Sequence, residues 1–248
     1  LQAARWLKPD GVFMTTAPLK EVAPHFAQAD EQGEVVVARL PNPTLSPAVY
    51  AYSVDFAGHH LAIQSAPGIF SPHGMDPGTA ALLDVVAPPQ GARFLDLGCG
   101  VGVVSKVASE VWGCQVTAVD VSARALRYTQ FNAPVARVIA SDGLAALKGE
   151  TFDYIASNPP YHTDFGVAKA FIERAYRQLA LEGTLALVVK RADWYVQKVR
   201  HTFGGCRIVE QDGYTVILAQ KRERKPGAAP AAPVTTKKHA KRMAAAQK

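Results

Sequence analysis

The middle of the chain alternates between short apolar runs and longer mixed stretches. The apolar runs predict five strands, at residues 93–98, 115–120, 136–141, 152–157 and 184–190. The stretches between them predict helices at about residues 103–112, 122–132, 166–181 and 193–203. This alternation predicts an α/β fold of the Rossmann-like, doubly wound kind, in which helices cover both faces of a mostly parallel sheet.

Two further strand-like runs close this region, at residues 206–211 and 214–220. They are separated by Asp212-Gly213, a dipeptide that favours a tight hairpin turn. The expected sheet therefore has seven strands and ends in a C-terminal antiparallel hairpin.

Polar residues come at the ends of four consecutive predicted strands. They are Asp96, Asp120, Asp142 and Asn158. Ligands of open α/β sheets bind at the carboxyl ends of the strands. We therefore expect these four side chains along one rim, beside a ligand.

A glycine loop follows the first of these strands. Gly98, Gly100 and Gly102 allow a sharp turn into a helix and let a ligand approach the backbone. A G-x-G-x-x-G dinucleotide loop would have a glycine where this chain has Val103. Asp96, just before the loop, would repel a pyrophosphate but can accept hydrogen bonds from an ammonium group. S-adenosylmethionine, with its amino-acid end and positive sulfonium, suits such a site better than NAD does.

The other two aspartates complete the expected cofactor site. Asp120, at the end of the second strand, is placed to accept hydrogen bonds from both ribose hydroxyls. Asp142, preceded by Ser141, is placed to accept a hydrogen bond from the adenine amino group. Each aspartate alone is equally well explained as a helix cap or turn residue. Their order around the glycines favours the ligand interpretation.

The segment Asn158-Pro159-Pro160-Tyr161 indicates the chemistry. Proline has no N–H, so this turn presents carbonyl oxygens beside an amide side chain. If Asn158 Oδ1 and the Pro159 carbonyl accept the two N–H groups of a planar amine, its lone pair points at the methyl donor. Tyr161 would stack on the ring that bears the amine, and His162 would contact a base edge or a phosphate. No metal is needed.

These motifs resemble class I S-adenosylmethionine-dependent methyltransferases that modify exocyclic or side-chain amide nitrogens. Residues 66–71 (Ala-Pro-Gly-Ile-Phe-Ser) and 75–83 (Met-Asp-Pro-Gly-Thr-Ala-Ala-Leu-Leu) resemble more narrowly the bacterial ribosomal RNA guanine-N2 methyltransferases of the small-subunit type. Those enzymes commonly have an Asn-Pro-Pro-Phe-His motif, and this chain has Tyr161 in place of the Phe. The resemblance implies a ribosomal RNA or ribosomal-subunit substrate, and a place for Thr79 near the methionine end of the cofactor.

The first forty residues resemble a second copy of the later sheet. Residues 5–13 align with residues 177–185, and residues 35–38 with residues 216–219. We expect residues 1–40 to be the remnant of a duplicated N-terminal methyltransferase-like domain whose upstream part is absent. Residues 41–49 would be a linker, and residues 50–221 the catalytic domain, opening with a hairpin of residues 50–56 and 61–65 around Gly58.

Charge is divided unequally along the chain. Residues 221–248 hold nine Lys or Arg and one acid, whereas residues 1–220 hold 18 bases and 20 acids. The segment 222–248 lacks apolar periodicity and is expected to be a basic disordered tail, able to attract RNA phosphates. A purely solubilising extension is the alternative.

Composition also bears on location. Three cysteines without metal-ligand spacing favour free thiols in a reducing compartment, and no apolar run is long enough to cross a membrane. We expect a cytoplasmic protein.

Several functions fit these observations. The first is N2 methylation of guanosine in ribosomal RNA. The second is N-methylation of another planar amine, such as adenine N6 or a protein glutamine amide, which Tyr161 fits equally well. A non-catalytic cofactor-binding or RNA-binding protein is a third, which intact Asp96 and Asn158 disfavour, and a nicotinamide dehydrogenase is a remote fourth.

Overall fold

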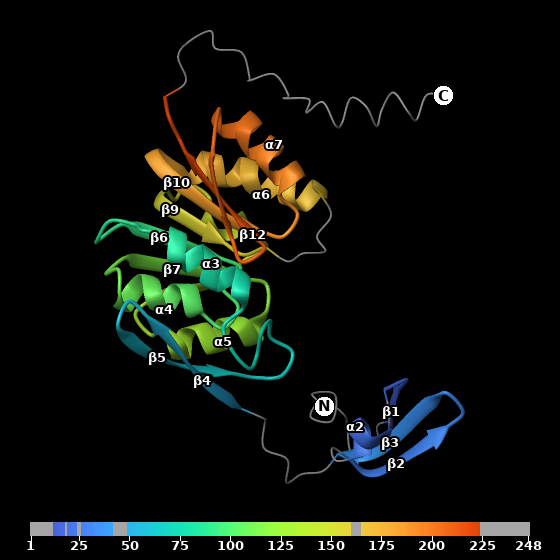
Figure 1. Ribbon diagram of the computed structural model, residues 1–248. Helices are drawn as coiled ribbons and strands as arrows, with labels where there is room; N and C mark the ends of the chain where they lie inside the picture. The colour runs from blue at the N-terminus through green and yellow to red at the C-terminus, as the bar shows by residue number, and fades with distance from the viewer. Residues whose placement is uncertain (1–11, 18, 24–25, 42–48, 160–164, 224–248) are drawn as a thin grey trace, which may run out of the picture. The chain divides into compact units, whose positions relative to one another are not determined.

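The computed structural model describes residues 12–17, 19–23, 26–41, 49–159 and 165–223 (Figure 1). The chain divides into two compact units, Leu1–Ala48 and Val49–Lys248. The expectations for residues 1–11, for the linker over residues 42–48 and for the tail beyond residue 223 lie outside the described residues.

In its described residues, the first unit is a three-stranded antiparallel sheet with one short helix. Its elements are β1 (Val12–Thr15), α2 (Leu19–Val22), β2 (Phe26–Gln32) and β3 (Val35–Pro41), and the strand order is β1-β3-β2. Val22, Phe26, Val36 and Ala38 form its small buried core. The expected strand at 35–38 thus lies within β3, at the centre of the sheet.

The second unit opens with the predicted hairpin. β4 (Tyr50–Phe56) and β5 (His59–Ser65) pair antiparallel around Ala57 and Gly58. Both turn residues have positive φ, 49° and 80°, the geometry of a two-residue turn that follows the twist of the strands.

The main sheet has the seven strands that the sequence predicts. Its order is β11-β12-β10-β9-β6-β7-β8, with β8, β7, β6, β9 and β10 parallel. β12 runs antiparallel between β10 and the edge strand β11. The strands are β6 (Arg93–Leu97), β7 (Gln115–Asp120), β8 (Arg137–Ala140), β9 (Phe152–Ser157), β10 (Leu179–Val189), β11 (Arg207–Gln211) and β12 (Tyr214–Gln220).

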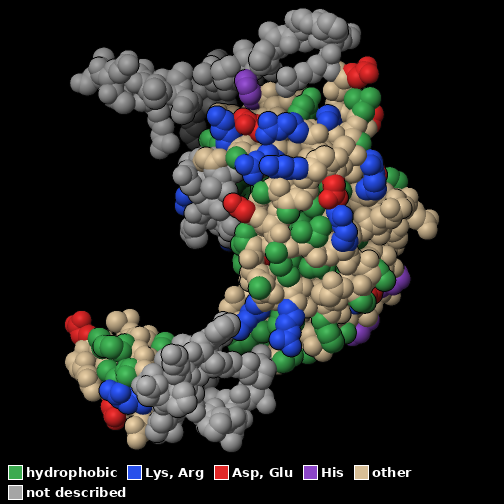
Figure 2. Space-filling model, turned by 180° about the vertical axis from the view of Figure 1, so that it is seen from behind, with side chains coloured by type: hydrophobic (Ala, Val, Ile, Leu, Met, Phe, Trp, Pro, Cys, Tyr) green, Lys and Arg blue, Asp and Glu red, His purple; other side chains and the backbone are tan. Residues whose placement is uncertain are grey.

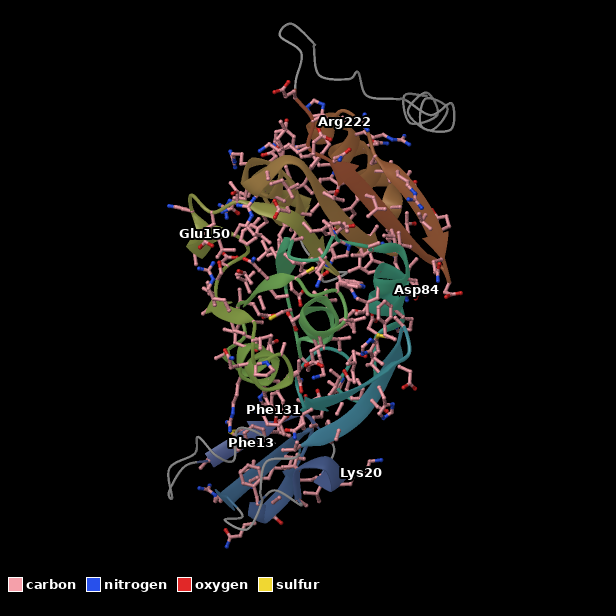
Figure 3. All side chains as sticks on the ribbon, turned by 90° about the vertical axis from the view of Figure 1, so that its left-hand side faces the viewer. Phe13, Lys20, Asp84, Phe131, Glu150 and Arg222 are labelled. Carbon is pink, nitrogen blue, oxygen red and sulfur yellow. The ribbon has the colours of Figure 1, made fainter. Side chains whose placement is uncertain are left out.

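Helices cover both faces of this sheet (Figures 1 and 3). The connecting helices are α3 (Pro77–Val85), α4 (Val103–Glu110), α5 (Ala123–Asn132), α6 (Phe165–Gln178) and α7 (Ala192–Phe203), with a 3₁₀ turn at Ala145–Leu147. Phe94 packs toward α3, α4 and the β4–β5 hairpin, whereas its neighbour Leu95 packs toward α6 and α7. This alternation along β6 separates two apolar cores, one on each face.

Two expectations need correction. We expected one helix over residues 166–181 and a strand from residue 184, but α6 ends at Gln178 and β10 begins at Leu179. The fully buried Leu179 pairs with Phe152 of β9, and a register shift before Thr184 takes up the extra residues. Burial against β9 therefore overrides the helical pattern. The helix α3 was not predicted at all.

Among the described residues, no helix is both long and apolar enough to cross a membrane.

Candidate active site

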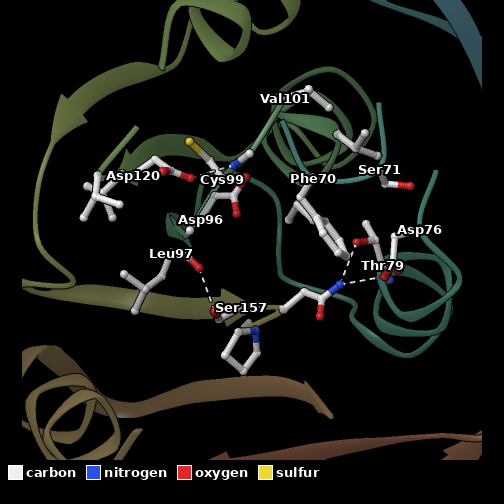
Figure 4. Close-up of a pocket in the computed structure, with 18 of the residues that line it drawn as sticks. Phe70, Ser71, Asp76, Thr79, Asp96, Leu97, Cys99, Val101, Asp120 and Ser157 are labelled. Atoms are coloured by element: carbon white, nitrogen blue, oxygen red, sulfur yellow. Dashed lines mark hydrogen bonds between the residues drawn. The ribbon is translucent and has the colours of Figure 1, made fainter. Parts of the chain in front are cut away.

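A cavity of about 420 Å³ lies at the carboxyl ends of the parallel strands. The structure brings most of the predicted site residues to its wall. These are Thr79, Asp96, Gly98, Gly100, Asp120, Asp142, Asn158 and Pro159. Apart from Thr79, which belongs to α3, they come from the carboxyl ends of the parallel strands β6, β7, β8 and β9 or from the segments that follow these strands. This is the arrangement expected for a ligand site of a parallel sheet (Figure 4).

The first part of the glycine loop leaves room for a ligand. Gly98 and Gly100 have φ values of 78° and 55°, a region that other residues adopt at a cost. A Cβ added at either position would meet no atom within 4 Å. A ligand can therefore approach this backbone closely.

Gly102 has a different structural role from the one expected. It does not line the cavity, and a Cβ there would lie 2.9 Å from the Thr129 Cα of α5. With φ at 87°, it also precedes the first turn of α4. The structure therefore uses Gly102 to pack α4 closely on α5.

Asp96 is buried inside the end of β6, one residue before the strand ends. Only 3% of it is exposed, and Ser105 Oγ donates a 2.6 Å hydrogen bond to its Oδ2. Burial raises the pKa of Asp96 to about 6, and the nearby Asp120 charge adds to the rise, while the Ser105 hydrogen bonds oppose it. A positive ligand group beside Asp96 would favour its charged form.

Asp120 ends β7 and connects the glycine loop to the next turn. Its Oδ2 accepts from Gly100 N at 3.0 Å, and its Oδ1 accepts from Ser122 N at 2.8 Å. Each carboxylate oxygen keeps further acceptor capacity for a ligand hydroxyl. Asp142 lies beyond the end of β8 and is exposed at the cavity wall.

Asn158 follows β9, whose last residue is fixed by a 2.6 Å hydrogen bond from Ser157 Oγ to Leu97 O. The Asn158 Nδ2 group donates to Asp76 Oδ2 at 2.8 Å and to Thr79 Oγ1 at 3.1 Å (Figure 4). Its Oδ1 is buried and has no hydrogen-bond partner within the described part of the chain. A buried acceptor of this kind costs stability unless a ligand satisfies it.

Asp76, Phe70 and Cys99 are among the cavity residues that were not predicted from the sequence. Asp76 contacts Asn158 from 82 residues away, and Phe70 lies on the same side of the cavity as Asp76 and Thr79 (Figure 4). Cys99 has its Sγ 3.2 Å from the Thr129 hydroxyl, which donates to it, and burial raises the pKa of this thiol. An Asp-Pro pair is a helix-start signal, so the sequence marks Asp76 as a cap but not as a neighbour of Asn158.

The predicted substrate contacts Tyr161 and His162 lie outside the described residues. Within the described ranges, no group of three or more His, Cys, Asp or Glu side chains is arranged to hold a metal ion.

The strand order, the glycine loop after the first parallel strand and the Asn-Pro-Pro-Tyr segment after the fourth define a Rossmann-like methyltransferase class. The comparisons with known proteins agree. The family model described as "Methyltransferase small domain" matches residues 60–218, and the chain belongs to this family.

Two curated relatives share the name ribosomal RNA small subunit methyltransferase C. The protein from Cronobacter sakazakii is 34% identical over 186 residues, which cover 70% of this chain. The protein from Pseudomonas aeruginosa is 32% identical over 199 residues, which cover 76% of this chain. These matches cover 53% and 60% of the relatives. The chain thus spans little more than half the length of the curated relatives it matches.

Solved structures give the same fold. The 16S rRNA N2 G1207 methyltransferase of T. thermophilus, in complex with AdoMet and guanosine, superposes with a TM-score of 0.75 at 25% identity, covering 89% of this chain and 67% of that one. A methyltransferase from Pyrococcus furiosus superposes with a TM-score of 0.57 at 20% identity, covering 66% and 90%. This second match supports the fold alone.

Proposed function

We propose that this chain transfers a methyl group from S-adenosylmethionine to the exocyclic N2 amine of a guanosine in small-subunit ribosomal RNA. The observation that carries the proposal is the Asn158 amide. Asn158 lines the cavity, its N–H groups are directed at Asp76 and Thr79, and its buried oxygen has no partner among the described residues. An amine N–H is the group that such an oxygen lacks.

The cavity fits the cofactor on two observations. Gly98 and Gly100 leave open space beside the loop, and the buried Asp96 offers a carboxylate to a positively charged ligand. We assign Asp96 and Thr79 to the amino-acid end, Asp120 to the ribose hydroxyls and Asp142 to the adenine amino group. These roles follow the predicted site residue by residue, except that Gly102 acts through helix packing.

The residues of this chain act by position rather than as strong bases. When bound, S-adenosylmethionine would supply a methyl group on sulfur; transfer of this group to the amine would leave the electron pair of the broken S–C bond on sulfur and would release one amine proton to water. Asn158 Oδ1 and the Pro159 carbonyl accept the two amine N–H groups and hold the nitrogen lone pair toward the methyl group. Tyr161 stacks on the guanine, and His162 contacts its edge or a phosphate.

The relatives support the substrate class. The curated matches are named for the small ribosomal subunit, and the T. thermophilus enzyme was solved with guanosine. Ribosomal RNA as substrate, together with three free cysteines, supports a cytoplasmic location.

The test is methyl transfer from labelled S-adenosylmethionine to ribosomal RNA from cells that lack this protein. Free RNA and assembled subunits are compared, and nucleoside digestion identifies the product. We expect N2-methylguanosine. N6-methyladenosine would move the acceptor to adenine, and label in protein in place of RNA would overturn the proposal in favour of a glutamine amide.

Two variants separate the acceptor from the cofactor. Asn158→Ala should lower kcat by on the order of 10²-fold or more while cofactor affinity stays nearly constant, because the lost contact is made to the acceptor. Asp120→Ala should weaken cofactor binding first. Calorimetric titration with the cofactor, beside steady-state kinetics, distinguishes them. Loss of cofactor binding in Asn158→Ala would contradict the assignment.

A further inference from the structure

We propose that Asp76 is a positioning residue that orients the Asn158 amide so that its oxygen faces the acceptor amine. This inference rests on the proposed function, because it names the residue that prepares Asn158 for the reaction. Asp76 lies before α3, far in sequence from the turn that it controls.

One oxygen atom of Asp76 makes two contacts. Its Oδ2 accepts from Thr79 N at 2.9 Å and from Asn158 Nδ2 at 2.8 Å. The Thr79 hydroxyl lies 3.1 Å from the same Nδ2. Both N–H groups of the Asn158 amide are therefore used inside the protein, and the amide oxygen alone has no partner among the described residues.

The charge of Asp76 fixes which way the amide points. A carboxylate only accepts hydrogen bonds, so it attracts the Nδ2 group of Asn158 and repels the Oδ1 atom. A rotated amide would place two acceptor oxygens against each other and would turn its N–H groups toward the amine donors. Asp76 thus selects the single orientation that can receive an amine.

The position of Asp76 is itself fixed by α3. Its side chain caps the helix, Pro77 occupies the first turn, and Leu82 and Leu83 are buried in the core. At Gly78, an added Cβ would lie 2.8 Å from Asp76 Oδ2 and 2.8 Å from Tyr214 Cε1. The glycine leaves the space in which the carboxylate stands, so the packed helix holds the carboxylate against Asn158.

Three variants of the full chain separate the cap from the contact with Asn158. In Asp76→Asn, the amide oxygen can replace Oδ2 and accept from both Thr79 N and Asn158. Asp76→Ser can still cap α3 but is too short to reach Asn158. Asp76→Ala loses both functions, and we expect it to have the lowest melting temperature.

Kinetics and binding give the first readout. Asp76→Ser should lower kcat on the order of 10- to 100-fold, with the cofactor Kd unchanged, whereas Asp76→Asn, which loses the charge but keeps an acceptor oxygen, should lose less activity. In an Asn158→Ala background, Asp76→Ser should cause no further loss, because Asp76 acts through Asn158. An additional loss there, or a weakened cofactor Kd in Asp76→Ser, would overturn the proposal.

The side-chain amide resonances of Asn158 give a second readout that needs no turnover. They are identified by their absence in Asn158→Ala, and they should shift further in Asp76→Ser than in Asp76→Asn. If the Asn158 amide resonances did not shift in a folded Asp76→Ser variant, the positioning role would be contradicted. If Asp76→Ser fails to fold, Thr79→Ala, which keeps the backbone bond to Asp76, should move the same resonances. Absence of RNA methylation by the wild type would reject the proposed function without changing this NMR result.

Discussion

The Asp96 carboxylate combines two properties that seldom occur together, deep burial and a position beside a ligand cavity. Its pKa of about 6 lies above the usual value because burial disfavours the charged form. Between about pH 4 and pH 6, the unfolded chain releases this proton while the folded chain keeps it. The Asp96 contribution to stability is therefore most favourable at the acid end of this window and is lost as the pH rises through it.

We predict that Asp96→Asn removes this dependence. The difference in unfolding free energy between the variant and the wild type should shift in favour of the variant by about 2–3 kcal/mol as the pH rises from 4 to 7. Each unit of pKa shift corresponds to about 1.4 kcal/mol. Urea unfolding of both proteins across this range measures the gain. Parallel curves would show that Asp96 keeps an ordinary pKa in the folded protein.

Cofactor binding should depend on the same proton. A positively charged ligand favours the ionised Asp96, so the cofactor Kd should rise as the pH falls below about 6, approaching tenfold per pH unit. Calorimetry in two buffers of different ionisation enthalpy detects the proton released on binding at pH 6. Asp96→Asn should bind more weakly and without this slope. A slope that persists in the variant would assign the proton to another group.

At the level of the elements, the two kinds of glycine in the loop should respond differently to the same change. Gly98→Ala carries only the cost of a left-handed backbone, about 1–2 kcal/mol, since its Cβ meets nothing. Gly102→Ala adds a clash with Thr129, worth a further 1–3 kcal/mol or so, between α4 and α5.

We therefore predict that Gly102→Ala lowers the melting temperature more, whereas Gly98→Ala weakens cofactor binding more by occupying ligand space. Thermal unfolding and cofactor titration of both variants test this. Equal losses of cofactor affinity would mean that Gly102 also contacts the ligand.

The sequence predicted the elements where the signal is local. The Asp212-Gly213 turn and the strands that end at Leu97 and at Asp120 are such cases. It failed at Leu179, because pairing with Phe152 of β9 is a tertiary contact. It also placed Asn158 at the site but missed Asp76, since nothing local indicates a hydrogen bond across 82 residues. Burial, which sets the pKa of Asp96, likewise needs the fold.

Over the whole molecule, residues 1–220 and the tail differ in charge. Residues 1–220 carry a formal balance of −2. On the face that Figure 2 shows, Lys and Arg side chains form separate groups. Residues 221–248 carry +8. A tail of this charge would add affinity for RNA phosphates without reading sequence.

We predict that deleting residues 224–248 weakens RNA binding and flattens its salt dependence, while the cofactor Kd stays constant. The deleted segment holds seven Lys or Arg, so the log–log salt slope should decrease by several units if most contact phosphates. Binding titrations at several salt concentrations measure the slope. An unchanged slope would favour the solubilising alternative.

We also retain the proposal that residues 1–40 derive from a duplicated domain. The order β1-β3-β2 has the same connectivity as β10-β12-β11, with α2 in the place of α7. Aligning Gly11 with Gly183 and residues 35–38 with 216–219 makes the pairs Val12↔Arg39 and Thr184↔Gln220 equivalent. This coincidence of register supports a common origin.

The orientation of Asn158 has a consequence for damaged nucleic acid. Guanine that has lost its amino group by hydrolysis becomes xanthine and presents a carbonyl oxygen where the amine stood. That oxygen would face the Asn158 oxygen, two acceptors with no proton between them. Sites that hydrogen-bond a substrate N–H discriminate against analogues without it by on the order of 10⁴-fold. The turn after β9 would thus bind a deaminated base poorly. A methylated nucleotide at this position would therefore be one that had kept its amino group.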